Sequence, residues 1–138
     1  MRQVQGVGPL TSLAYVLTLE DPQRFARSRT VAAYLGLTPR RDQSGDREPQ
    51  LGISKAGNEY LRRLLVSSAQ YVLGRYGKPC ELREWGLRLA QRGAKNAKKR
   101  AVVAVARKLA VLLHRLWVSR TKYEPWRRSS PPAMAVAA

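Results

Sequence analysis

Residues Asn96 to Ser119 read NAKKRAVVAVARKLAVLLHRLWVS and form the longest run of helical periodicity in the chain. Apolar side chains recur every three or four residues, which predicts one helix with a continuous buried stripe. The stripe consists of Val102, Val105, Ala106, Leu109, Leu112, Leu113, Leu116 and Trp117. Polar residues interrupt the apolar run at Arg107, Lys108, His114 and Arg115. A membrane span needs ~20 mostly uncharged residues, so we expect a helix of a soluble protein.

Three shorter segments near the N-terminus also have helical signals. Pro9 suits the first position of a helix, because its missing N–H costs nothing there. One face of that helix is predicted to consist of Leu10, Leu13, Ala14 and Leu17. Asp21 is the expected N-cap of a second, short helix, with Phe25 packed inward. A third segment covers residues 28–35 and ends at Gly36.

Two longer helices are expected before the last one. Asn58 is a candidate N-cap for a helix to about Leu73. Its predicted buried stripe consists of Tyr60, Leu61, Leu64, Leu65, Ser68, Tyr71 and Val72. The next helix is expected from Glu81 to Arg92, with Gly93 as its stop. Its inward residues are predicted to be Leu82, Trp85 and Leu89.

Periodicity stops between residues 37 and 53, where prolines, glycines and charges alternate. This segment predicts a long irregular loop, or a short hairpin turning at Ser44-Gly45-Asp46, and loops of such length are often functional. The fold class is therefore all-α, a compact helical domain with one long irregular loop or short hairpin. We place the domain at residues 1–123 and expect a disordered, Pro/Ala-rich tail at 124–138.

Positive charge dominates the composition. The 138 residues hold 26 Lys and Arg against 9 Asp and Glu, for a net charge of +17. This excess predicts a polyanionic partner, and nucleic acid is the first candidate. Cys80 and His114 are the single cysteine and histidine, which argues against an intrachain disulfide and a Cys/His zinc site. With no signal-peptide core, the chain is expected to be cytoplasmic and nucleoid-associated, without a membrane partner.

The first motif is the turn Gly6-Val7-Gly8-Pro9 before a helix. Two glycines in this spacing match the hairpin of helix-hairpin-helix modules, in which the backbone approaches a phosphate and helix amides hold its charge. The alternative is an ordinary turn at the start of a helix. Gly6 and Gly8 are therefore candidate nucleic-acid contacts, and the net charge favours that interpretation.

The second motif is the loop around Ser44-Gly45. A serine beside glycine is accessible, and Arg40 and Arg41 lie close enough in sequence to absorb charge on a phosphate. Ser-Gly-Asp is also common turn chemistry, and no histidine lies near to act as a base. From these residues alone, a polar surface turn is the simpler interpretation.

Two further basic groups are candidates for phosphate contacts. Lys55, Asn58, Arg62 and Arg63 surround the start of a predicted helix, and they fit either a phosphate site or a solvated basic face. Between residues 83 and 108 nine basic residues accompany one acid, Glu84. The density is highest at Lys95, Lys98, Lys99 and Arg100. This second group favours non-specific nucleic-acid binding, since a merely soluble helix would mix both signs of charge.

The ordered set of these motifs resembles a known family. The matching pieces are GVGPLT at 6–11, Phe25, VAAYLGLTPR at 31–40, QSG at 43–45, ISKAGN at 53–58, LRRLL at 61–65, NAKK at 96–99 and AVVAVARKLA at 101–110. In this order they resemble the C-terminal domain of transposases of the insertion-sequence 110/116/902 family, which includes the Piv-type DNA invertases. The resemblance covers about residues 4–124.

The resemblance implies a function that composition does not. Such proteins have an N-terminal RuvC-like nuclease domain, whose Asp and Glu side chains bind metal, and a C-terminal domain with a catalytic serine in a Ser-Gly motif. Ser44 occupies the matching position. The resemblance implies a covalent phosphoserine link to DNA, a bridge RNA as guide, and assembly into homo-oligomers. Arg40, Arg41, Lys55 and Arg62 then become candidate phosphate clamps.

This sequence starts almost directly at the Gly-x-Gly turn, so we expect it to lack the RuvC-like domain. Mg²⁺ is expected in that missing domain, with no cofactor in this chain. The resulting prediction is a transposase domain that binds DNA and guide RNA and supplies the serine nucleophile, without recombining DNA alone. The alternative is a non-catalytic nucleic-acid-binding module, with Ser44 as a plain turn residue. A ribosome-associated basic protein is a third interpretation.

Overall fold

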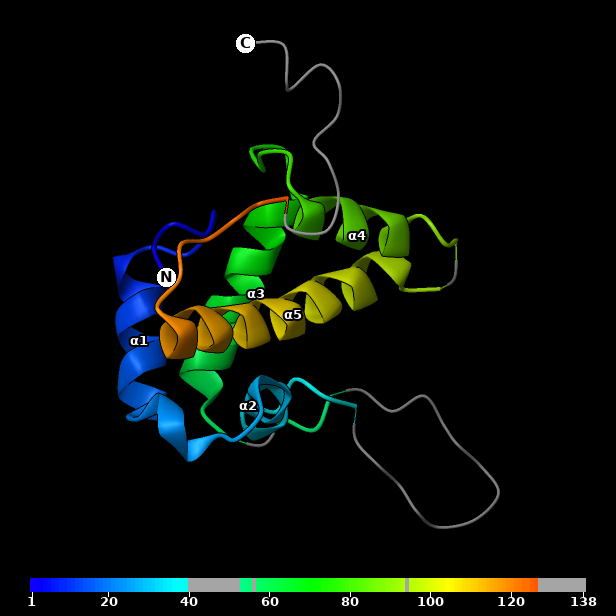
Figure 1. Ribbon diagram of the computed structural model, residues 1–138. Helices are drawn as coiled ribbons and strands as arrows, with labels where there is room; N and C mark the ends of the chain where they lie inside the picture. Colours follow the sequence, from blue (N-terminus) through cyan, green and yellow to red (C-terminus); the bar gives the residue numbers. More distant parts are fainter. Residues whose placement is uncertain (40–52, 56, 94, 127–138) are drawn as a thin grey trace, which may run out of the picture.

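The computed structural model describes residues 1–39, 53–55, 57–93 and 95–126. The secondary-structure elements of these residues are all helices, so the fold class is all-α, as predicted (Figure 1). The α-helices are α1 (Pro9–Leu19), α2 (Ser28–Tyr34), α3 (Glu59–Leu73), α4 (Glu81–Ala90) and α5 (Ala97–Ser119), with a 3-10 turn, η1, at Pro22–Arg24.

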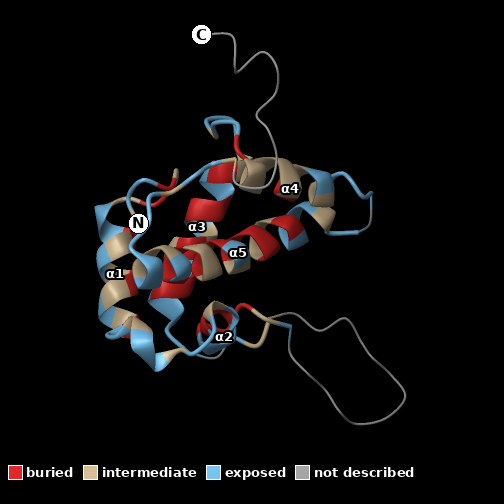
Figure 2. Cartoon of the chain, in the orientation of Figure 1, coloured by how far each residue is buried: buried red, intermediate tan, exposed pale blue. Residues whose placement is uncertain are grey.

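Helix α5 is the centre of the domain. It packs against α2, α3 and α4, which surround it in Figure 1, while α1 lies near its C-terminal end. The predicted stripe is confirmed: Val105, Ala106, Leu109 and Leu113 are fully buried, and the other members are partly buried against them. Figure 2 shows buried residues concentrated on α3 and α5, so the core lies between the two longest helices.

Helix α1 buries the opposite face from the one predicted. Leu10, Leu13 and Leu17 are 57%, 56% and 65% exposed, whereas Tyr15 and Leu19 are fully buried. The hydroxyl group of Tyr15 donates a hydrogen bond to the carbonyl oxygen of Ala110 in α5 (2.6 Å). This long-range bond satisfies the buried hydroxyl and orients the helix, so the prediction from leucine spacing is wrong.

The capping predictions are confirmed. The Asn58 side chain accepts a hydrogen bond from the Leu61 amide (2.8 Å) at the start of α3, and the Asp21 side chain accepts one from the Gln23 amide (2.9 Å). Each cap satisfies an amide that has no partner within its own helix. In α3, Tyr60 and Tyr71 are exposed, contrary to the predicted stripe, and its other predicted members are buried or partly buried.

Helix α4 approaches α3 and α5 closely at Gly86. This glycine is buried, and a Cβ atom there would lie 2.6 Å from the side chains of both Leu73 and Val105. Such a contact is shorter than van der Waals packing allows, so only glycine fits without a shift of its neighbours. The close approach fixes α4 beside α5, where the two helices form one wall of a groove described below.

The segment after α5 returns across α4. The carbonyl oxygen of Pro125 accepts a hydrogen bond from the Glu81 amide (2.9 Å), and the Tyr123 amide donates one to the side-chain oxygen of Gln3 (3.1 Å). The Pro125 carbonyl thus satisfies the amide of the first residue of α4, and the predicted boundary at residue 123 stays a prediction. Residues 127–138 lie outside the described part of the chain.

Candidate nucleic-acid interface

The serine loop, residues 40–52, begins at the end of α2. The Gly36 amide donates to the Ala33 carbonyl and the Leu37 amide donates to the Ala32 carbonyl, both at 3.0 Å. With Gly36 at φ +74°, these bonds form a Schellman motif, in which glycine adopts the left-handed conformation at low cost. The motif confirms Gly36 as the helix stop and directs the chain toward Pro39.

The two ends of the serine loop are paired. Pro39 and Ile53 form an isolated antiparallel bridge. Beside it, the Ser54 amide donates to the Thr38 carbonyl (2.9 Å) and the Lys55 amide donates to the Gly36 carbonyl (3.1 Å). This pairing, the root of the loop, joins its two described ends, and the turn predicted at Ser44-Gly45-Asp46 lies outside the described residues. Ser44, Arg40 and Arg41 lie outside the described residues, so the structure positions the root of their loop and not their side chains.

The turn from the loop root into α3 holds Lys55 at the surface. Lys55 is exposed and has φ +57°, a conformation that costs energy for a residue with a Cβ atom. Gly57 follows at φ +84°, and a Cβ atom on it would overlap the carbonyl oxygen of Tyr34. The turn thus packs its backbone directly on the end of α2.

Arg62 and Arg63 have different environments. Arg62 is 8% exposed, and its guanidinium donates a hydrogen bond to the carbonyl oxygen of Leu35 (3.3 Å). Arg62 thus joins α3 to the end of α2, and a direct phosphate contact by this residue stays a prediction. Arg63 is exposed and forms an ion pair with Glu59 (2.9 Å), as expected for a solvated helix face.

The two N-terminal glycines differ in their surroundings. Gly6 has φ +83°, and a Cβ atom there would lie 2.8 Å from the backbone oxygen of Ser68 in α3. This glycine therefore allows close packing of the turn on α3. At Gly8, the N-cap of α1, a Cβ atom would meet no described atom within 4 Å. The turn precedes α1 as predicted, and a phosphate contact at either glycine stays a prediction.

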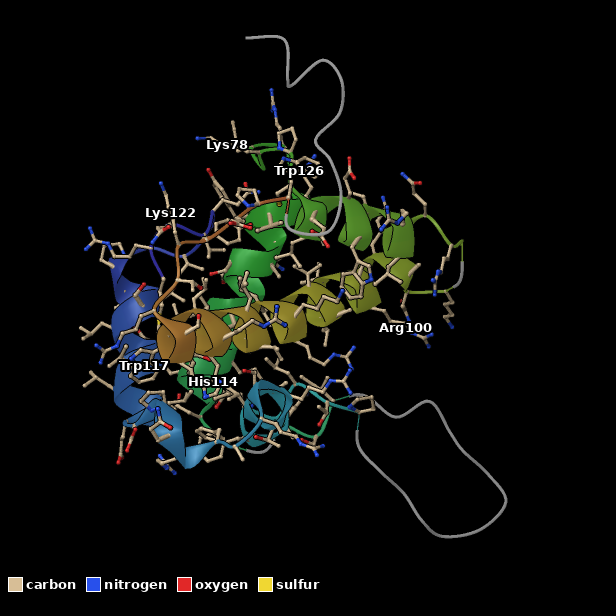
Figure 3. All side chains as sticks on the ribbon, in the orientation of Figure 1. Lys78, Arg100, His114, Trp117, Lys122 and Trp126 are labelled. Atoms are coloured by element: carbon tan, nitrogen blue, oxygen red, sulfur yellow. The ribbon has the colours of Figure 1, made fainter. Side chains whose placement is uncertain are left out.

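Basic side chains gather at the N-terminal end of α5. Lys95, Lys98, Lys99 and Arg100 are all exposed, and the first turn of α5 has no acidic residue. Figure 3 shows Arg100 at the end of α5 opposite Trp117. The N-terminus of a helix carries a partial positive charge, which repels these cations. An anion bound there would interact favourably with the cations and with the helix N-terminus. We call these four residues the basic end of α5.

A groove of about 640 Å³ lies along α5 between α2, α4 and the returning C-terminal segment. Its cationic lining consists of Arg29, Arg88, Arg107, Lys108 and Arg115. Its apolar lining includes Ala32, Leu82, Trp85, Val111, Leu112, Tyr123 and Pro125, and its carboxylates are Glu81 and Glu124. With five cations against two carboxylates, this basic groove carries a net positive charge. Thr38 also lines it, so the groove reaches the root of the serine loop.

Sequence reasoning missed the basic groove. Trp85 packs partly buried against the core, as predicted, but it also lines the groove, with the ammonium group of Lys108 3.8 Å from its ring centroid. Arg29 and Arg115 come from helices far apart in sequence, so no local motif joins them. The one available signal was the spacing of Arg107, Val111 and Arg115, which places all three on one face of a helix.

The single histidine has a structural role. His114 is 2% exposed, and its Nε2 lies 2.9 Å from the carbonyl oxygen of Pro22, which only accepts hydrogen bonds. Nε2 therefore carries the proton. Its Nδ1 lies 2.8 Å from the Ser28 hydroxyl, and Phe25 packs against the ring. His114 thus connects α5 to η1 and α2 (Figure 3) and is too buried to act on a substrate.

No group of three or more His, Cys, Asp or Glu side chains in the described part of the chain could hold a metal ion. None of its helices is long and apolar enough to cross a membrane.

The sequence motifs agree with a match to a known family. Residues 1–85 match the family described as Transposase IS116/IS110/IS902 family, and this match covers both sides of the serine loop. The chain belongs to this family.

Individual relatives show the same relationship. The chain is 37% identical over 128 residues to the transposase for insertion sequence element IS1111A of Coxiella burnetii, covering 92% of this chain and 34% of that protein. A probable family 20 transposase of Pseudomonas aeruginosa is 35% identical over 123 residues, covering 88% of this chain and 36% of the relative. The pilin gene-inverting protein of Moraxella lacunata is 29% identical over 110 residues, covering 79% of this chain and 33% of that protein. The chain thus spans about a third of the length of these relatives.

Proposed function

We propose that the chain is the C-terminal, DNA-handling domain of an insertion-sequence transposase, and that Ser44 is its nucleophile in DNA transposition. The observation that carries this proposal is the family match over residues 1–85, which includes Ser44-Gly45 and both sides of the loop root. The bridge between Pro39 and Ile53 supports it, because the two described ends of the serine loop are held together beside the basic groove.

The proposed reaction is a transesterification at phosphorus. The hydroxyl oxygen of Ser44 forms a bond to a backbone phosphorus, the bond to one sugar oxygen breaks, and that oxygen leaves as a hydroxyl after taking a proton. Arg40, Arg41 and Lys55 would neutralise the non-bridging oxygens. We assign the Mg²⁺ that the family resemblance implies to the RuvC-like domain of such transposases.

Binding of duplex DNA is assigned to the exposed cations. The basic end of α5 supplies charge without a base code, as non-specific phosphate contacts do. The turn at Gly6 and Gly8 is a further phosphate contact of the helix-hairpin-helix type in this proposal. The complete transposase would act on nucleoid DNA as a homo-oligomer guided by a bridge RNA, as the family resemblance implies.

The nucleophile is tested in a chimera in which this chain replaces the matching third of the Coxiella burnetii transposase. Ser44→Ala should abolish strand cleavage and the covalent protein–DNA adduct, while DNA binding is retained. Ser67→Ala, at an exposed serine of α3, is the matched control and should leave both activities unchanged. Cleavage by the Ser44→Ala chimera at the parent rate would instead support a non-catalytic nucleic-acid-binding module.

A further inference from the structure

The lining of the basic groove combines apolar and cationic side chains. Its apolar members Ala32, Leu82 and Trp85 are buried or partly buried, whereas Arg29 and Arg88 are exposed. The groove therefore combines an apolar floor with cationic rims. In duplex DNA the flat faces of the bases are stacked inside the helix, so a duplex could contact the rims and leave the floor empty.

The cations of α5 are spaced along the groove. Arg107, Val111 and Arg115 follow each other at four-residue intervals on one face of the helix. At 1.5 Å per residue, the two arginines are separated by about 12 Å along the helix axis. A backbone lying along α5 would thus contact cations at more than one phosphate, with Arg29 and Arg88 adding charge from the two flanking helices.

Trp85 supplies the aromatic surface. Its indole ring is part of the groove lining, and the Lys108 ammonium group lies over one face at 3.8 Å from the centroid, so a base stacked on that face would displace the ammonium group. Aromatic rings beside a positively charged track are how proteins bind unpaired nucleotides, because every base has a flat face that stacks and every phosphate has a charge to neutralise.

We propose that the basic groove binds a single-stranded polynucleotide, with a base stacked at Trp85 and the backbone along Arg107 and Arg115. The choice of nucleic acid over an acidic peptide rests on the proposed function. The location of the groove fits a role in strand exchange, since Thr38 lines the groove and also belongs to the root of the serine loop. An unpaired strand in the groove would lie next to that root.

The test measures binding by the full chain to fluorescent oligonucleotides of about 10 nucleotides, as anisotropy at fixed salt. The probes are oligothymidylate, oligouridylate, a DNA duplex of equal length and an oligoglutamate peptide. We expect one or both single-stranded probes to bind at least about tenfold more tightly than the duplex and the peptide. Tighter binding of oligothymidylate would identify the bound strand as DNA, and tighter binding of oligouridylate would identify it as RNA. Equal or tighter binding of the duplex or the peptide would overturn the proposal.

Two sets of variants place the strand in the groove. Arg29→Gln, Arg88→Gln and Arg115→Gln combined should weaken single-strand binding by about tenfold or more. The matched control combines Arg27→Gln, Arg75→Gln and Arg120→Gln, which remove the same charge from exposed arginines outside the groove lining. An equal loss in the two triple variants would show that the strand binds the general positive surface and would overturn the groove assignment.

Trp85 is tested by two substitutions that keep a bulky apolar side chain. Trp85→Phe should retain most of the affinity, whereas Trp85→Leu should lose about fivefold or more, because only the phenyl ring stacks on a base. Circular dichroism melting of both variants checks that the domain stays folded. The same binding series on Ser44→Ala separates the two proposals, since groove binding should persist there even if that serine proves not to be the nucleophile.

Discussion

The guanidinium of Arg62 in α3 donates a hydrogen bond to the carbonyl oxygen of Leu35, at the end of α2. This contact joins the two helices that flank the serine loop. Gly36 and Lys55, at the two described ends of the loop, are joined by the hydrogen bond from the Lys55 amide to the Gly36 carbonyl. Arg62 thus stabilises the packing of the two helices at the base of the loop.

Arg62→Met should destabilise the domain by about 2 kcal/mol, because a buried carbonyl loses a charged hydrogen-bond donor. Arg63→Met is the matched control on the exposed side of the same turn, where loss of the ion pair with Glu59 should cost less than about 0.5 kcal/mol. Urea unfolding followed by circular dichroism measures both. Equal losses in the two variants would mean that the Arg62 contact contributes no more than a surface ion pair.

Gly57 gives a second test of the loop base. Gly57→Ala combines a left-handed backbone, at about 1 kcal/mol, with overlap on the Tyr34 carbonyl oxygen, at about 1–3 kcal/mol more. Gly93→Ala is matched in backbone conformation, at φ +73°, but its Cβ atom would meet no described atom within 4 Å. The Gly93 variant should therefore lose only about 1 kcal/mol in the same urea experiment. A larger loss at Gly93 than at Gly57 would contradict the packing of the turn on α2.

Local chemistry explains which parts of the fold were predictable. The Asn58 cap and the Gly36 stop were both identified from the sequence, because each depends on a residue type and its immediate neighbours. The orientation of α1 was not, since it depends on a hydrogen bond between Tyr15 and Ala110, 95 residues apart. Leucine spacing shows that α1 has an apolar face but does not show which face meets the core.

The candidate site divides in the same way. The basic end of α5 was predicted because its cations are adjacent in sequence. The basic groove was missed because it assembles Arg29, Arg88 and Arg115 from three helices. The burial of Arg62 was not predicted, because a charged side chain suggests a surface, whereas the fold packs this one against the end of α2. Charge patterning therefore locates a binding face only where the cations are local.

Buried tyrosine hydroxyls should make the domain sensitive to alkaline pH. Burial raises the pKa of Tyr15 above its ordinary value of 10.0, and burial followed by the neighbouring Cys80 raises the pKa of Tyr123. Tyrosines of the unfolded chain lose their protons above pH about 10, whereas Tyr15 in the folded protein keeps its proton. Stabilisation by Tyr15 is thus fully present below pH 10 and is lost above it, by ~1.4 kcal/mol per pH unit.

Tyr15→Phe isolates this contribution. The variant should lose about 1 kcal/mol at neutral pH, where the hydrogen bond to Ala110 is missing, and should show a shallower decline above pH 10. Urea unfolding between pH 8 and pH 11 gives the slopes. Parallel slopes for the parent and the variant would contradict a protonated Tyr15 in the folded state.

Arg120 offers a stabilising substitution. It follows α5 as the C-cap with φ +53° and ψ +31°, a left-handed conformation that favours glycine, and its side chain is exposed. Arg120→Gly should raise the free energy of unfolding by about 0.5–1 kcal/mol, because the strain caused by the Cβ atom disappears. Arg120→Ala keeps that atom and is the control, with no gain expected. A gain for alanine equal to that for glycine would assign the effect to lost charge repulsion.

The basic end of α5 predicts a specific salt dependence of duplex binding. The logarithm of the affinity falls as the logarithm of the salt concentration rises. Lys98→Gln combined with Lys99→Gln should make this slope shallower by about 0.9 for each phosphate contact removed, hence by up to about 1.8. The matched pair is Lys78→Gln with Lys122→Gln, which removes the same charge from exposed lysines away from Arg100 (Figure 3). That pair should leave the slope nearly unchanged, because counterions are released from DNA only by cations that neutralise its phosphates. Equal changes in the two pairs would show that duplex DNA responds to the total charge of +17 and not to a defined surface.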